Sequence, residues 1–97
     1  MSDSTKKEVT IELKKVSTKE ELQILLKQKL DFPDYYGENW DAFWDTITGL
    51  VELPEKIIFK HWSDLEKSIP DEANSLKEML NNFNKKYPMM KTEVEYK

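Results

Sequence analysis

The stretch Tyr35–Glu52, YYGENWDAFWDTITGLVE, predicts a short amphipathic helix that begins after Asn39 and ends near Gly49. Asn39 is a favourable N-cap, because its side chain can accept a hydrogen bond from a backbone N–H in the first turn. Gly49 stands where a C′ glycine is expected, and glycine adopts a positive φ there without steric cost. Apolar side chains with helical spacing predict the face that packs into the core, and they are Trp40, Phe43 and Ile47.

Acidic residues occupy another face of the same predicted helix. Asp41 and Asp45 are four positions apart, and such a like-charged pair costs roughly 0.2–0.5 kcal/mol. The helix dipole favours Asp41 in the first turn, but Asp45 is too near the other end to benefit. Trp44 lies beside both, and a partly exposed aromatic next to charge is typical of binding surfaces. An arrangement of charges that costs helix stability without a local compensation indicates a functional role. The alternative is an acidic face that is merely exposed to solvent.

The acidity of the chain is concentrated around this helix. The 26 residues Leu30–Glu55 hold seven acidic residues and no basic one, whereas the rest of the chain holds 12 acidic residues and 15 lysines. A localised acidic surface suggests a basic protein partner. We expect no direct binding of nucleic acid, because phosphate contacts need a high density of basic residues, and the chain has no arginine to clamp a phosphate.

The length and composition predict one small domain, residues 1–97, with residues 1–8 flexible. No cysteine is present, so neither a disulfide nor thiol chemistry is expected. No apolar run approaches the ~20 residues of a membrane span, and the first residues lack the apolar core of a secretory signal. We therefore expect a cytoplasmic protein, monomeric when free, with no membrane contact and no cofactor.

The pattern along the chain predicts an α/β fold. The expected strands are 9–13, 56–60 and 91–96, and the expected helices are 17–29, 40–48, 63–69 and 71–86. Possible capping boxes open two of these helices, at Ser17 or Thr18 and at Ser63. Strands separated by helices pair in parallel, so we predict a three-stranded parallel sheet with about four helices. The apolar run Ile57–Phe59 favours the middle position for its strand.

Enzyme chemistry finds little support in the sequence. His61 is the only histidine and is expected at the surface or at a helix cap. No Cys/His cluster predicts a metal site, and no glycine-rich loop predicts phosphate binding. Asp41 and Asp45 could act as general acid and base, but no neighbouring cation would orient a substrate. A carboxylate hydrolase is thus a third hypothesis, and we expect no catalytic activity.

The stretch Pro33–Pro54 fits the pattern PxYYGxNxDAxWDxxTGxVExP, and here the chain resembles the barstar family, intracellular inhibitors of the bacterial ribonuclease barnase. In element order the resemblance extends from Val9 to Tyr96, but outside the motif it is weak. It implies the same small parallel sheet with helices packed on it. It also implies inhibition by a helix and its preceding loop, which together block the active site of the nuclease.

The resemblance implies roles for ten residues. Asp45 matches the principal carboxylate, which replaces a substrate phosphate among the basic residues of the enzyme, and Tyr35 matches the aromatic that packs on its catalytic histidine. Five residues match further contact positions of the family: Asn39, Asp41, Thr48, Gly49 and Glu52. Three more match positions that form the same surface or support it from beneath: Tyr36, Gly37 and Trp44. Acidic side chains would also steer association with a basic partner, for which barnase and barstar are themselves the standard example.

Some positions depart from the family pattern. Leu50 replaces a tryptophan, Trp40 replaces a leucine, and Asn82 and Lys86 stand at or near positions where glutamates extend the acidic surface. The nuclease could therefore be a relative of barnase. An acidic docking module that binds another basic protein without inhibiting anything is the alternative. Both hypotheses require Asp41 and Asp45 to be free of the chain's own lysines.

Overall fold

The computed structural model describes residues 7–97. Their elements are β1 (Glu8–Glu12), α1 (Lys19–Lys29), α2 (Trp40–Gly49), β2 (Lys56–Lys60), α3 (Trp62–Ser68), α4 (Pro70–Lys86), the 3-10 turn η1 (Pro88–Met90) and β3 (Glu93–Tyr96). The α/β class and the order of strands and helices are as predicted. Of the segment expected to be flexible, residues 1–6 lie outside the described part. For Glu8 the expectation was wrong, because β1 begins there and the N–H of Lys56 donates to the Lys7 carbonyl at 2.9 Å.

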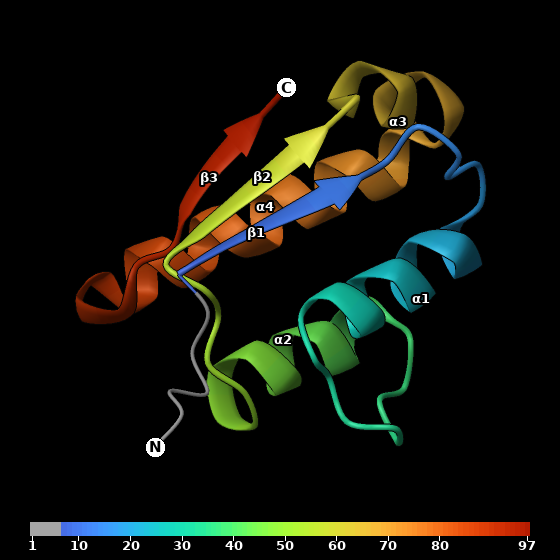
Figure 1. Ribbon diagram of the computed structural model, residues 1–97. Helices are drawn as coiled ribbons and strands as arrows, with labels where there is room; N and C mark the ends of the chain where they lie inside the picture. The colour runs from blue at the N-terminus through green and yellow to red at the C-terminus, as the bar shows by residue number, and fades with distance from the viewer. Residues whose placement is uncertain (1–6) are drawn as a thin grey trace.

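The sheet is parallel, in the order β1-β2-β3, and β2 occupies the middle as its apolar run indicated. Val9 pairs with Ile57, and Ile11 with Phe59, so alternate side chains of neighbouring strands share one face. Ile11, Ile57 and Phe59 are fully buried on that face. Figure 1 shows α4 running behind the sheet, with α1 and α2 below β1 in this view.

Helix α1 begins with a complete capping box. The N–H of Glu21 donates to the Thr18 hydroxyl at 3.1 Å, and the Glu21 carboxylate accepts from the N–H of Thr18 at 3.2 Å. Of the two boxes considered, the one at Thr18 is therefore formed. Leu22 and Leu26 of this helix are fully buried in the hydrophobic core.

Helix α2 has the predicted start but a different end. The Asn39 side chain accepts from the N–H of Ala42 at 2.8 Å. Gly49 was expected outside the helix with a positive φ, but it is the last residue of α2, and no glycine in residues 7–97 has a positive φ. The N–H groups of Leu50 and Val51 both donate to the Thr46 carbonyl at 3.0 Å, so the helix closes without a left-handed residue.

The predicted cap at Ser63 is wrong, because α3 begins at Trp62 and its N-cap is His61. The Trp62 ring packs on Phe59 and Tyr96, with centroid separations of 5.4 and 4.6 Å. This buried contact fixes the start of the helix one position before Ser63. His61 is exposed at the cap position, and its ring contacts the Glu12 carboxylate. Within residues 7–97, no helix has the length and apolar character needed to cross a membrane.

Candidate protein-binding surface

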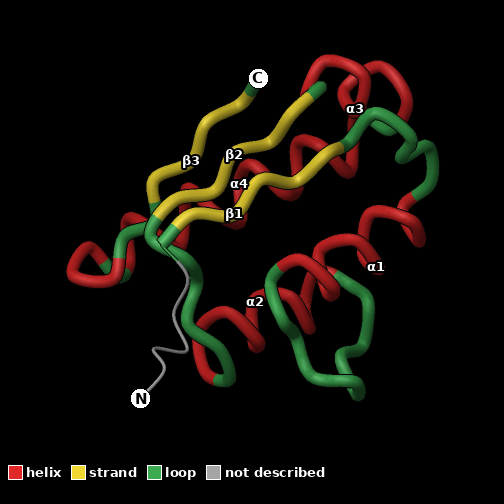
Figure 2. The backbone as a smooth tube through the Cα atoms, in the orientation of Figure 1, coloured by secondary structure: helices red, strands yellow, loops and turns green. Residues whose placement is uncertain are grey.

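The loop between α1 and α2, drawn green in Figure 2, contains two neighbouring tyrosines that differ in burial. Tyr36 is 6% exposed, and its ring packs 4.8 Å from that of Phe32, measured between centroids. Phe32 in turn contacts Phe43 of α2 at 5.7 Å. Tyr35, by contrast, is 76% exposed. The aromatic anchor beneath the loop thus leaves Tyr35 on the surface, where a partner could reach it.

The buried hydroxyl of Tyr36 ties the loop to α1. It donates to the side-chain oxygen of Gln23 and lies 3.3 Å from the carbonyl oxygen of Asn39. Burial raises the pKa of Tyr36 above its ordinary value, and the nearby Glu38 carboxylate acts in the same direction. Tyr36 is therefore placed to support the surface rather than to form it. Gln23 is the buried partner that sequence reasoning missed, and nothing in its local pattern could have identified it.

Gly37 lies against the first turn of α2. Gly37 itself does not have a positive φ, whereas the neighbouring Glu38 does, at 55°. A Cβ at position 37 would lie 3.3 Å from the Ala42 Cβ, which is a tight contact. The Asn39 amide donates to the Gly37 carbonyl at 3.1 Å and also caps α2. Close packing between loop and helix, rather than a special φ, therefore explains the glycine.

Asp41 and Asp45 are exposed on the outer face of α2, and neither forms an ion pair with any residue in 7–97. They line a groove of about 620 Å³ between α2 and α4. The groove is lined by Asp41, Trp44, Asp45, Met79, Asn82 and Lys86. Trp44 is half-buried and packs on the core. The expectation that the two carboxylates stay clear of the chain's own lysines is met across the described residues.

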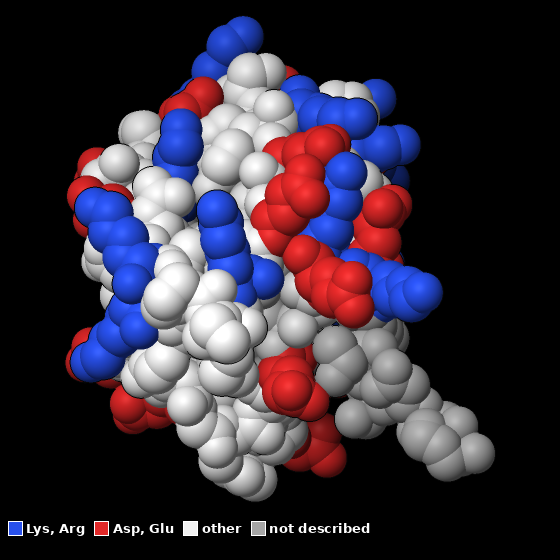
Figure 3. Space-filling model, turned by 90° about the vertical axis from the view of Figure 1, so that its left-hand side faces the viewer, with Lys and Arg blue, Asp and Glu red and all other residues white. Residues whose placement is uncertain are grey.

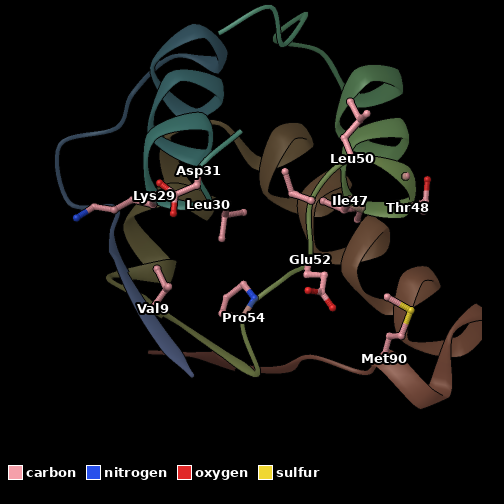
Figure 4. Close-up of a pocket in the computed structure, with 12 residues that line it drawn as sticks. Val9, Lys29, Leu30, Asp31, Ile47, Thr48, Leu50, Glu52, Pro54 and Met90 are labelled. Carbon is pink, nitrogen blue, oxygen red and sulfur yellow. The ribbon is translucent and has the colours of Figure 1, made fainter. Parts of the chain in front are cut away.

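The C-terminal end of α2 borders a second hollow, of about 560 Å³. Figure 4 shows Thr48 and Leu50 on one side of it and Leu30 and Asp31, at the end of α1, on the other. Gly49 and Glu52 also line it. Of the ten predicted site residues, three line the groove and three line the second hollow, whereas Tyr35, Tyr36, Gly37 and Asn39 line neither. The Thr48 hydroxyl donates to the Trp44 carbonyl at 2.7 Å.

Two methionines complete these hollows, and sequence reasoning gave neither a role. Met79 of α4 lines the groove, and Met90 of η1 lines the second hollow. Both come from segments far from the motif, so only tertiary contact could reveal them. Met89 and Leu50 are also exposed, at 95% and 55%. Figure 3, which views the molecule from the left-hand side of Figure 1, shows a largely uncharged tract from the centre to the lower edge, with both lysines and acidic groups on either side of it.

Within residues 7–97, no three His, Cys, Asp or Glu side chains are grouped closely enough to hold a metal ion. The surface instead offers fixed carboxylates beside exposed aromatic and aliphatic side chains. Such a combination is suited to binding another protein.

Comparison with known proteins agrees with this geometry. The family model described as "Barstar (barnase inhibitor)" matches residues 6–97. A Bacillus subtilis (strain 168) protein described as "Putative ribonuclease inhibitor YrdF" is 60% identical over 37 residues, which are 38% of this chain. That match covers 41% of the length of the Bacillus protein. The motif, the parallel sheet and the family match together show that this chain belongs to the barstar family.

Proposed function

We propose that this protein inhibits a small basic ribonuclease of the barnase type by covering its active site with α2 and the preceding loop. The observation that carries the proposal is the state of Asp41 and Asp45, which are exposed and have no cationic partner within the described residues. Membership of the barstar family supports it. Tyr35, at 76% exposure, would supply the aromatic contact beside the carboxylates.

The chemistry of the target explains why carboxylates suit this task. A ribonuclease site gathers basic groups to bind the phosphates of RNA, and a fixed carboxylate can occupy the place of a phosphate. Asp45 would fill the central position, with Asp41 beside it. Opposite charges on two surfaces also accelerate encounter, and salt screens this effect.

The electrostatics of α2 itself give a second reason to expect a cationic partner. Asp45 lies in the second half of a ten-residue helix whose last turn contains no basic residue. Its charge gains nothing from the positive end of the helix dipole and is opposed by Asp41 four positions earlier. A cation from the partner would offset this repulsion, so part of the binding free energy would come from relief of a local cost.

The test is a titration of the purified protein against a panel of small secreted bacterial ribonucleases, followed by cleavage of a labelled RNA. We expect loss of activity of at least one nuclease at equal molar amounts, and an association rate that falls as salt is raised. Failure to inhibit any member of the panel, or association insensitive to salt, would reject the proposal.

The second candidate is an acidic docking module that binds a basic protein without inhibiting it. Three departures from the family pattern favour this candidate. Leu50 replaces an aromatic contact residue, and Asn82 and Lys86 stand at or near contact positions where the family has acidic residues. This function predicts a stable complex with a partner that has no ribonuclease activity. We expect inhibition instead, by a cytoplasmic immunity protein that is monomeric when free and folds as one domain.

A further inference from the structure

We infer that Lys86 divides the α2–α4 groove into a negative and a positive edge, and that the ribonuclease partner presents a carboxylate to the positive edge. The inference rests on the proposed function and adds a property of the partner. A nuclease that fits would place basic groups against Asp41 and Asp45 and an acidic side chain against Lys86. A nuclease that is basic across this whole contact would be disfavoured.

The placement of Lys86 carries the first step. It is the last residue of α4, and it lines the same groove as Asp41 and Asp45 of α2. The helix dipole favours a positive charge in the last turn of a helix, so the charge of Lys86 is stabilised even when no partner protein is bound. Asn82, one turn earlier on α4, also lines the groove and carries no charge. The α4 side of the groove therefore offers one cation and no anion.

The charges face the same hollow without neutralising each other. Lys86 is exposed and forms no ion pair with a residue of the described part, and the same holds for both aspartates. Exposed charges separated by water interact weakly, so each remains available to a partner. The groove thus presents a pattern of two signs rather than a uniform negative surface.

The apolar lining explains how the pattern could select a partner. Trp44 and Met79 line the same groove as the charged residues and pack on the core while remaining partly exposed. A partner side chain that covers them excludes water, and Met79 can adapt its shape to that side chain. Once water is excluded, a lysine facing another cation becomes costly, whereas a lysine facing a carboxylate is matched. Selection would therefore act by repulsion as well as attraction.

The experiment compares Lys86→Glu and Lys86→Gln with the matched control Lys85→Glu. Lys85 is the neighbouring residue in the last turn of α4 and is exposed, but it does not line the groove. Inhibition constants are measured against whichever barnase-type nuclease of the panel the wild-type protein inhibits most tightly. We expect about 3–10-fold weaker inhibition for Lys86→Gln, about 10–100-fold for Lys86→Glu, and less than about threefold for Lys85→Glu.

The two lysine-to-glutamate variants lose the same helix-dipole interaction, so equal changes in thermal stability will show that differences in inhibition come from the groove. Inhibition by Lys86→Glu that equals or exceeds that of the wild type would overturn the inference while the proposed function stands. If the wild type inhibits no nuclease of the panel, the proposed function fails and the inference fails with it.

Discussion

Helices α1 and α2 follow opposite electrostatic rules on their outer faces. In α1, Glu20 and Glu21 occupy the first turn and Lys27 and Lys29 the last turn, so both ends match the helix dipole. In α2 the last turn contains no basic residue, and Asp45 lies beyond the first turn, which is the turn where the dipole would favour an anion. The charges of α1 are matched at both ends, whereas Asp45 of α2 forms no ion pair with a residue of the described part.

The inner faces of the two helices do not differ in this way. Leu22 and Leu26 of α1 are fully buried, and so are Phe43 and Ile47 of α2, to within 1%. Both helices therefore contribute to the core through ordinary apolar packing. The difference is confined to the outer face. Under the proposed function, α1 serves the fold alone, whereas α2 also binds the partner.

The largest expected effect tests the structural role of α1. Leu22→Ala removes a fully buried side chain and should lower the free energy of unfolding by about 2–5 kcal/mol. Urea denaturation measures the loss. Ile24→Ala is the control on the same helix, because Ile24 is 43% exposed and should cost much less. Equal losses would show that the α1 stripe does not carry the packing described above.

The next effect tests the outer face of α2. Asp45→Ala should weaken inhibition of the target nuclease roughly 100-fold, the size expected when a central interface residue is truncated. The control is Asp71→Ala, which removes an exposed carboxylate from the first turn of α4 and should change inhibition less than about threefold. Similar effects of the two substitutions would remove the functional distinction between α2 and the rest of the surface.

A smaller effect is expected from loss of the hydrogen bond that joins Tyr36 of the loop to Gln23 of α1. Tyr36→Phe leaves the buried Gln23 side chain without its donor and should cost about 1–3 kcal/mol. Tyr35→Phe, at an exposed position, should stay within about 0.5 kcal/mol. Urea denaturation of both variants would check this, and equal costs would contradict the inward and outward assignment of the two tyrosines.

The same tie predicts a dependence on pH. The folded pKa of Tyr36 lies above its ordinary value of 10.0, because burial disfavours the phenolate. Its contribution to stability is therefore complete below pH 10 and is lost as the pH rises above that value. Stability should fall less steeply above pH 10 in Tyr36→Phe than in the wild type. Some decline remains in the variant, since burial also raises the pKa of Tyr96.

The caps of the two helices should differ in what they affect. Thr18→Ala and Asn39→Ala each remove an N-cap and should each cost about 1 kcal/mol. Asn39→Ala also removes the hydrogen bond to the Gly37 carbonyl, so it should weaken inhibition as well. Thr18→Ala should leave inhibition unchanged. Inhibition measured beside urea denaturation would separate the two outcomes, and a loss in Thr18→Ala would contradict the comparison.

The smallest expected effect is a gain in stability when the charge of Asp45 is removed. Asp45→Asn removes the repulsion between Asp45 and Asp41 and should raise the free energy of unfolding by about 0.2–0.5 kcal/mol. Asp41→Asn removes an anion from the first turn and should lower it or leave it unchanged. Both should weaken inhibition. A loss of stability in Asp45→Asn would show that α2 carries no local electrostatic cost.

Local signals in the sequence were sufficient for the element order and for the starts of α1 and α2. Caps depend on residues within one turn, and apolar periodicity depends on a few neighbours, so both can be read without a fold. Two helix boundaries differ from the prediction. Gly49 stays helical because the N–H groups of Leu50 and Val51 both donate to the Thr46 carbonyl. Helix α3 begins at Trp62, whose ring packs on Tyr96 of β3, a contact between segments distant in the chain.

By itself the sequence determined the charge of α2, its division into apolar and acidic faces, and the family motif around it. Only the tertiary structure decided that Tyr35 faces outward while Tyr36 is buried, and that Lys86 shares a groove with Asp41 and Asp45. The reason is that these contacts join segments distant in the chain. Their distances are set by how α1, α2 and α4 pack around the sheet, and no local pattern records that packing.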